Sequence, residues 1–250
     1  MDTLNKLTPG ENISVTARVI DEPESQIVRN KKIIKLKVGD ATNIANLVAW
    51  EPQTKKFEKI NLALGDVVEV KLGLCPKSHK NTNRPPTITV TQSTILKKAQ
   101  IKDFPGVEEC RKIKFLDELG DYQYAFVRVF VSGVYNTVVY FCNTCKKFSE
   151  KMCDCGKFPD PIFSVSGTFS DGTRTMPFTT LSEDVAGKMT KSKKPDAEKI
   201  NPEILMNHPF TLFGYVRNEH FYVEDVIDKA DFFGALKGVG SFTKEDEFNS

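Results

Sequence analysis

Four of the six cysteines of this chain lie within residues 142–155, in the stretch CNTCKKFSEKMCDC. Their spacing is Cys-x2-Cys, then seven residues, then Cys-x-Cys. Two interpretations are open: disulfide or redox chemistry, and a single metal site. Four thiolates can surround one tetrahedral Zn²⁺ ion with Zn–S bonds of about 2.3 Å. If a metal is bound, the fold must bring two short turns of the chain together around one point.

The cellular compartment helps to decide between these interpretations. The N-terminus, MDTLNKLTPGENISV, has no basic segment followed by an apolar one, so nothing resembles a secretory signal. The longest apolar stretch, residues 124–141, is too interrupted and too β-branched for a membrane helix. We therefore expect an intracellular protein without membrane contact, whose thiols stay reduced, and the spacing favours zinc. The predicted ligands are Cys142, Cys145, Cys153 and Cys155.

We expect this zinc to be structural rather than catalytic. A catalytic site keeps an open coordination position and usually includes histidine or a carboxylate. The three histidines lie far from the cluster in the sequence, and no His-x-Glu pair precedes the cysteines. Gly156, directly after the last cysteine, is expected to let the backbone turn around the metal. Cys75 and Cys110 stand alone and are expected to be buried.

Short β-branched segments bounded by Gly, Pro, Asp or Asn make up most of the first hundred residues. The predicted strands of this antiparallel sheet are ISVTARVIDEP, KIIKLKVGD, ANLVAWE, DVVEVKLG and TITVTQS. Between the third and fourth, PQTKKFEKINLALG has apolar residues at helical spacing: Phe57, Ile60 and Leu64. Three strands, a short helix and two more strands are the order of an OB-fold, a small Greek-key barrel.

The second half of the chain repeats this order with an insertion. Its predicted strands are AFVRVFVSGVY, FSVSGTFSD, TRTMPFTT, FTLFGYVRN and HFYVEDVI. LSEDVAGKM is the predicted helix, with Ser182 as its N-cap. The cysteine cluster falls between the first two strands. VGDATNIANLVAW and FSDGTRTMPF both place an Asp-x-Thr turn before a strand that ends in an aromatic ring, which indicates a duplicated barrel.

The predicted fold class is therefore all-β with short helices: two tandem OB-fold barrels, the second of which carries an inserted zinc ribbon. We expect the first barrel over residues 1–100 and a connector over residues 101–121. The second barrel is expected over residues 122–227, with the zinc ribbon at 142–155. Residues 228–250 are expected to form a short helix and an acidic tail.

The chain resembles the large subunit of replication protein A, of the archaeal or minimal type, from its start to about Val226. The Asp40–Thr42 turn followed by Trp50 is similar to the first-barrel signature of that family. YFCNTCKKFSEKMCDCGKF followed by FSVSGTFSDGTRTMPFTTLSEDVAGKM is similar to its zinc-bearing barrel. The chain differs in its Cys-x-Cys spacing and in having only two barrels.

This resemblance implies non-sequence-specific binding of single-stranded DNA in replication, recombination and repair. The protein would then be associated with the chromosome, with replication or repair proteins as partners. The resemblance also implies that the C-terminal segment, with Phe232, Phe233 and Leu236 on one side, assembles homo- or hetero-oligomers. Two alternatives for this segment stay open: an acidic peptide that recruits partners or competes with DNA, and a frayed terminus.

Aromatic side chains that stack on bases contribute about 1–3 kcal/mol each to single-strand binding. The family usually places one such residue at the end of the third strand and one on the last hairpin of each barrel. Trp50 matches the first of these positions, and the segment RPPTITV offers no aromatic residue for the second. In the second barrel the candidates are Phe178 and either Phe221 or Tyr222, because alternation lets only one of the latter face the groove. The alternative for each is a core position, which we expect for Phe126 and Phe130.

The net charge of the chain is only +2, so positive charge must be concentrated locally if the protein binds nucleic acid. The loops that flank an OB-fold groove are rich in lysine and arginine here. The alternative is a solvated face. Phosphate contacts would make affinity fall steeply with salt. The candidates are Arg29, Lys31, Lys32, Lys35, Lys37, Lys77, Lys80 and Arg84 in the first barrel, and Arg128, Lys146, Lys147, Arg174 and Arg217 in the second.

Two alternative functions stay open. One is an RNA-binding protein with an OB-fold and a zinc ribbon, and the other is a non-catalytic assembly scaffold of a nucleic-acid enzyme. We expect no enzyme, because the sequence lacks a GxxxxGKS loop, a nucleophile elbow and an HExxH motif. Asp40 and Asp171 are expected to cap their Asp-x-Thr turns. Stacking residues and lysines do not distinguish DNA from RNA, so the choice of DNA depends on the family resemblance.

Overall fold

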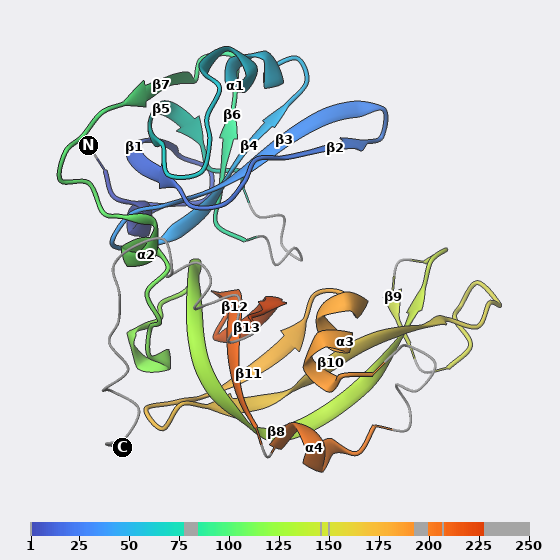
Figure 1. Cartoon of the computed structure of the whole chain (residues 1–250). Coiled ribbons are helices and arrows are strands. Elements are labelled where there is room, and N and C mark those ends of the chain that lie inside the picture. Colours follow the sequence, from blue (N-terminus) through green and yellow to red (C-terminus); the bar gives the residue numbers. More distant parts are fainter. Residues whose placement is uncertain are drawn as a thin grey trace, which may run out of the picture.

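The computed structural model of the chain describes residues 2–77, 85–145, 147–149, 151–192, 200–206 and 208–227. Two closed sheets, one from each half of the chain, lie next to each other (Figure 1). Several predicted features fall outside the described residues: Lys80, Arg84, Lys146 and the segment 228–250. In the described part of the chain, none of the helices has the length and apolarity that a membrane crossing requires.

The first barrel is built from seven strands and one helix. β1 (Asn12–Val19) pairs antiparallel with β3 (Lys31–Gly39) and β5 (Val67–Leu74), and β3 pairs with β4 (Ile44–Trp50). β6 (Thr87–Val90) runs parallel to β4 and antiparallel to β5, which closes the ring in the OB-fold order. Two strands of this barrel were not predicted: β2 (Glu24–Val28), which pairs with β3, and β7 (Ile95–Ala99), which pairs with β5. The expected helix is α1 (Thr54–Ile60).

The second barrel closes in the same order. β8 (Gln123–Cys142) pairs antiparallel with β10 (Asp160–Ser170) and β12 (Pro209–Arg217). β11 (Thr175–Thr180) pairs with β10 and runs parallel to β13 (His220–Val226), which pairs with β12. The predicted class, two tandem OB-folds in an all-β chain with short helices, is confirmed. α3 (Glu183–Thr190) follows β11, and the hydroxyl of Ser182 accepts the N–H of Val185 as the predicted N-cap. α4 (Pro202–Met206) was not predicted.

The Asp-x-Thr pattern that the two halves of the sequence share forms the same turn in both barrels. Asp40 Oδ1 accepts the N–H and the hydroxyl of Thr42 at 2.7 and 2.6 Å, and Oδ2 accepts the N–H of Leu4 at 2.7 Å. Asp171 makes the same contacts to the threonine two positions later, at 2.9 and 2.7 Å, and to the N–H of Leu116, at 2.7 Å. The predicted capping role is confirmed. Each carboxylate also holds the 3₁₀ turn that precedes its barrel, η1 (Leu4–Lys6) or η2 (Leu116–Glu118).

We expect Asp171→Asn to lower the free energy of unfolding by about 1–3 kcal/mol, because the charged acceptor of several hydrogen bonds is lost. Burial disfavours the ionised carboxyl, but the donors of Leu116, Thr173 and Arg174 outweigh it and hold the pKa of Asp171 below its usual value. A carboxyl with a lowered pKa stabilises the fold above its unfolded-state pKa and loses this effect as the pH falls through the folded-state pKa. The difference in free energy of unfolding between Asp171→Asn and wild type should therefore have its full size at about pH 7 and shrink below about pH 4.

Urea unfolding at both pH values measures this difference, with Asp117→Asn as the matched control. Asp117 lies in the same 3₁₀ turn but is exposed, so its substitution changes the net charge equally. An equal loss in both variants at pH 7 that disappears at the lower pH would show that only net charge matters.

A third hydrophobic cluster joins the two barrels through the connector, which contains α2 (Val107–Cys110). The Tyr124 ring stacks on Phe213 with the centroids 5.1 Å apart and meets Tyr215 edge to face at 5.3 Å. Burial raises the pKa of the Cys110 thiol to about 11, as expected for a packed cysteine. The two barrels therefore pack as one unit. The buried members of the cluster are Ile20, Ile44, Cys110, Tyr124, Phe126, Phe213 and Tyr215.

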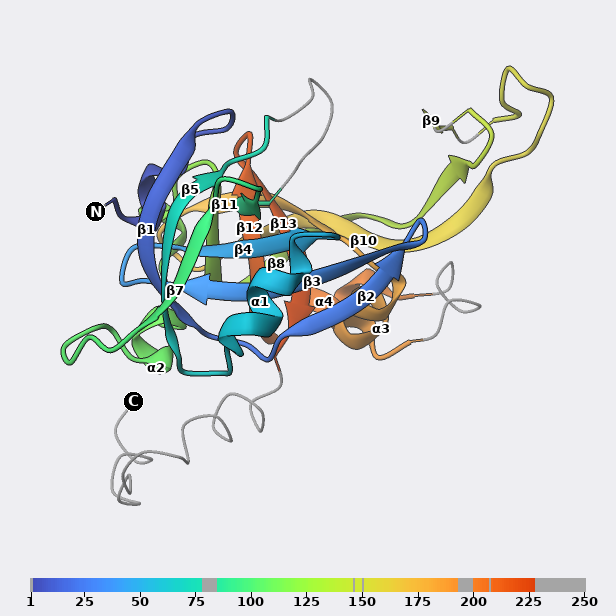
Figure 2. The ribbon, with the colours of Figure 1, turned by 90° about the horizontal axis from the view of Figure 1, so that it is seen from above.

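The two longest strands continue beyond the second barrel as an arm. The second half of β8 pairs with the start of β10, and the arm ends at β9 (Lys147–Phe148) and the cysteines (Figure 2). The arm leaves the barrel where Gly167 lies against Gly133. A Cβ atom on Gly167 would overlap the carbonyl oxygen of Gly133, so only glycine allows this approach.

Candidate metal centre and nucleic-acid interface

The four clustered cysteines form a compact set of sulfur ligands at the end of the arm. All four sulfur atoms lie within 4.8 Å of one another, and Cys142 Sγ lies 3.6 Å from Cys155 Sγ. A tetrahedron with metal–sulfur bonds of about 2.3 Å has edges of about 3.8 Å. None of the four is in a disulfide. The donor set and its spacing therefore fit a tetrahedral metal ion, and zinc is compatible with them.

Two short turns bring the sulfur atoms together. The first follows β8, where the N–H of Cys145 donates to Cys142 Sγ at 3.5 Å. In the second, the N–H of Gly156 donates to the Cys153 carbonyl at 2.8 Å. Gly156 has φ +75°, the left-handed conformation expected of it. The hydrogen bond from the Cys145 N–H lowers the pKa of the Cys142 thiol, whereas the hydrogen bonds with the neighbouring cysteines raise the pKa of Cys145.

A second surface feature lies on the first barrel around the only tryptophan of the chain. Val28, Arg29, Lys31 and Trp50 line an open depression of about 450 Å³. Arg29 and Asn30 have φ of +51° and +61°, which is typical of the type I′ turn that joins β2 to β3. This turn presents Arg29 and Lys31 beside the Trp50 side chain, which is 40% exposed. An exposed ring with two neighbouring cations is a combination that can hold a base and a phosphate.

The outer face of β3 and β4 continues from this depression. Trp50 lies opposite Ile33, Val48 opposite Lys35, and Asn46 opposite Lys37. Because strand residues alternate between the two faces, these pairs form one strip that runs from Trp50 to Asn46. Lys35 and Val48, in the middle of the strip, are half-buried.

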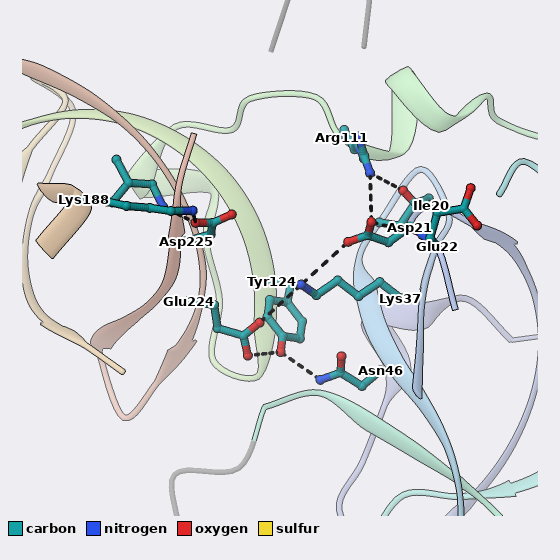
Figure 3. A network of polar contacts seen from close by, with 11 residues as sticks. Ile20, Asp21, Glu22, Lys37, Asn46, Arg111, Tyr124, Lys188, Glu224 and Asp225 are labelled. Carbon is teal, nitrogen blue, oxygen red and sulfur yellow. Dashed lines mark hydrogen bonds and ion pairs between the residues drawn. The ribbon is translucent and has the colours of Figure 1, made fainter. Parts of the chain in front are cut away.

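The second barrel covers the Asn46 end of this strip. Lys37 Nζ lies 3.7 Å from Glu224 and 3.9 Å from Asp21, and 4.6 Å from the centroid of the Phe213 ring. Figure 3 shows this lysine between the two carboxylates. The prediction that Lys37 contacts nucleic acid is therefore wrong, because its charge is already neutralised and its side chain is only 18% exposed.

Polar contacts around Lys37 join both barrels and the connector (Figure 3). The Tyr124 hydroxyl donates to Glu224 at 2.5 Å and accepts from the Asn46 amide at 2.9 Å. Arg111 donates to the Ile20 carbonyl and lies 3.8 Å from Asp21. Sequence reasoning missed Tyr124 and Glu224. The only signal for Glu224 was its position in HFYVEDVI, two residues after Tyr222 and therefore on the same face of the strand.

The predicted stacking residues of the second barrel are buried. Phe178 and Phe221 are both fully inaccessible, and each packs on Phe169 with ring centroids 5.1 and 5.4 Å apart. A base cannot reach either ring, so these two predictions are wrong. On β13 it is Tyr222 that points outward, and it is half-buried against Tyr215.

Of the two residues of β8 that were predicted to lie in the core, one is buried and the other is exposed. Phe126 and Phe130 lie on the outer face of this strand, between inward-pointing valines. Phe126 is buried as predicted, but in the cluster that joins the barrels. Phe130 lies beyond the edge of that cluster and is 54% exposed, so its predicted core position is wrong.

Four other predicted cations lie near acidic side chains. Arg217 is held by Asp121 at 2.6 Å and by the Tyr122 ring, which leaves it little freedom to reach a phosphate. The others are Lys32 with Glu58 at 2.7 Å, Arg174 with Glu219 at 3.5 Å and Lys147 with Asp154 at 3.9 Å. Within the described ranges, five predicted cations make no ion pair: Arg29, Lys31, Lys35, Lys77 and Arg128.

Fold and surface together define a tandem OB-fold protein with a four-cysteine ribbon. Among solved structures the chain is similar to a replication protein A heterotrimer bound to single-stranded DNA, with 13% identity, a TM-score of 0.38, and coverage of 94% of this chain and 70% of that chain. It is also similar to a murine DNA-binding protein bound to double-stranded DNA, with 12% identity, a TM-score of 0.44, and coverage of 84% and 92%.

A replication factor A related protein from Methanobacterium thermoautotrophicum is similar over a shorter range. Its identity is 22% and its TM-score 0.32, with 40% of this chain and 90% of that chain covered. The resemblance to replication protein A drawn from the sequence is thus found again among structures, and at this level it concerns the fold alone. No protein-family model and no curated protein matches the chain.

Proposed function

We propose that this chain binds single-stranded DNA without sequence preference, as a non-catalytic protein of replication, recombination and repair. The observation that carries this proposal is the depression at Trp50, where one exposed indole ring lies beside Arg29 and Lys31. Stacking on the ring tolerates any base, and the two cations are placed for the phosphates on either side. The sequence resemblance to the replication protein A large subunit favours DNA over RNA, and a chromosome-associated location follows from it.

The part of the strip from Trp50 to Lys35, which the second barrel leaves open, supports the proposal. It extends the depression along β3 and β4, the strands whose outer face binds oligonucleotides in OB-folds. Lys35 supplies a further positive charge and makes no ion pair among the described residues, although Glu24 lies opposite it on β2. Lys77, in the loop between β5 and β6, is exposed as well. The metal would contribute by holding the ribbon in shape rather than by chemistry.

We expect Trp50→Ala to weaken binding of oligo-dT by about tenfold to a hundredfold, the factor for loss of one stacked base. In the wild-type protein, oligo-dT should quench the emission of Trp50 and bind less tightly as salt rises. The measurement is a titration with fluorescently labelled oligo-dT, oligo-rU and duplex DNA across a salt series.

Ile27→Ala is the matched control for Trp50→Ala. Ile27 is an exposed apolar residue of the same hairpin, next to Val28 and therefore on the opposite face of β2. Its substitution should leave the affinity unchanged. Preference for oligo-rU would assign the site to RNA, and equal weakening by both variants would count against a site at Trp50.

A further inference from the structure

We infer that the ribbon at the end of the arm carries a second base-stacking site, formed by Phe148 and Phe158. This inference rests on the proposed function, because it names a further contact for the same single-stranded nucleic acid. The site replaces the two stacking positions of the second barrel that the core occupies.

Phe148 is exposed although it lies in a strand. β9 pairs with the end of β8, with Phe148 opposite Phe141. The two ring centroids are 5.1 Å apart with an angle of 59° between the planes. Phe148 is nevertheless 70% exposed. A ring that is supported on one side and open on the other loses little conformational freedom when a base stacks on it.

Phe158 has the corresponding position after the second pair of cysteines. The preceding carbonyl, of Lys157, accepts the N–H of Cys153 at 2.9 Å, so the backbone before Phe158 is tied to the metal-binding turn. Its ring is 79% exposed, the highest value among the large hydrophobic residues in the described part of the chain. Each of the two rings therefore lies beside one turn of the metal centre.

The surroundings of the two rings favour a nucleic acid over a protein as the occupant. Each phenylalanine directly follows a lysine, Lys147 or Lys157, and both lysines are exposed. The Nζ atom of Lys147 lies 3.9 Å from Asp154 Oδ2, a long distance for an ion pair. The Asp154 side chain is almost fully exposed, so water screens this pair. On β9 the Lys147 side chain points to the face opposite the Phe148 ring, so the two lysines supply positive charge to the ribbon as a whole rather than next to each ring. Exposed rings on a positively charged segment are the combination that binds single strands.

The arm also points in a suitable direction. The β2–β3 hairpin, which carries the Trp50 depression, and the ribbon extend from the same side of the molecule in both views (Figures 1 and 2). One strand could therefore lie on the first barrel and reach the ribbon. A short oligonucleotide would occupy the Trp50 site alone, and only a longer one would also reach Phe148 and Phe158.

The test uses the full chain in its zinc-loaded form. It is titrated with oligo-dT of two lengths, about 8 and about 30 nucleotides, which match one and two OB-folds. We expect the double variant F148A/F158A to bind the longer oligonucleotide about tenfold more weakly. Binding of the shorter one and its quenching of Trp50 should stay as in wild type. Phe130→Ala is the matched control, because Phe130 is an exposed phenylalanine of the same barrel outside the ribbon. An unchanged zinc content shows that the ribbon of the variant is intact.

A direct readout places a tryptophan at the site. F148W in a Trp50→Phe background should be quenched by the longer oligo-dT if bases stack at the ribbon. Wild-type affinity of F148A/F158A for the longer oligonucleotide, with no quenching of F148W, would overturn the inference while the Trp50 site stands. If wild-type protein binds neither oligonucleotide, the proposed function fails, and the inference fails with it.

Discussion

Tyr124→Ala is expected to lower the free energy of unfolding by about 3–5 kcal/mol, the usual cost of removing a large buried ring. Tyr124 is fully buried between the barrels, where its ring contacts Phe213 and Tyr215. Its hydroxyl joins Asn46 of the first barrel to Glu224 of the second. Loss of the ring leaves a cavity in the shared cluster and two polar groups without their partner. Urea unfolding measures the stability, and small-angle scattering shows whether the barrels separate.

Tyr124→Phe separates the contribution of the ring from that of the hydroxyl. Burial, and then the neighbouring Glu224 carboxylate, raise the pKa of Tyr124 well above its usual value, so the hydroxyl stays protonated and donates to Glu224. Its removal should cost about 1–3 kcal/mol, because the half-buried Glu224 carboxylate and the buried Asn46 amide lose a partner. A cost below about 1 kcal/mol for both variants would mean that the barrels fold independently and that their contact adds little.

The contact between the barrels also limits where nucleic acid can bind. Lys37 and Asn46 lie on the face that OB-folds use for ligands, yet Glu224, Tyr124 and Phe213 cover them. The open part of this face begins at Lys35 and ends at the hairpin that carries Arg29. Three of the five predicted cations that make no ion pair in the described part of the chain, Arg29, Lys31 and Lys35, lie here, which is why the proposed site centres on Trp50 and not on the junction.

The barrel order could be predicted from the sequence because each strand is short, β-branched and bounded by turn residues. The side-chain directions could not be predicted in the same way. Trp50 and Phe178 both lie near the end of a third strand, but Trp50 faces outward and Phe178 inward. A shift of one residue moves a side chain to the other face of a sheet. In TMPFTT the large apolar residues Met176 and Phe178 share one face, so the alternation favours the core for Phe178, and the stacking prediction came from the family position instead.

Long-range contacts explain the other differences. Nothing near Lys37 in the sequence indicates that Glu224 neutralises it, because that contact depends on how the second barrel docks. The exposed rings of the ribbon were missed for a related reason. Phe148 and Phe158 look like ordinary hydrophobic residues, and only the small size of the ribbon leaves them without a core to enter. The cysteines needed no such information, because their spacing, together with the expected reducing compartment, already favoured a metal site.

Cys145→Ser or Cys153→Ser should reduce the zinc content from about one ion per chain to almost none, since a structural site needs all four ligands. Structural zinc contributes about 10–16 kcal/mol of binding free energy, which becomes folding free energy of the segment it holds. The described residues of the ribbon contribute only the short strand β9 and one pair of packed rings, so the ribbon should unfold without the metal. Metal analysis and proteolysis within residues 142–158 measure the two effects.

The barrels should survive this loss, because the sulfur atoms lie outside both cores. The unfolding transition followed by Trp50 emission should therefore keep its midpoint, and binding of short oligo-dT should persist. Cys75→Ala is the matched control, since Cys75 is buried in the first core and should not affect the zinc content. If Cys145→Ser kept its zinc, the metal would not be held by four thiolates. If Cys145→Ser also abolished the change in Trp50 emission on binding of short oligo-dT, the ribbon would be part of the Trp50 site.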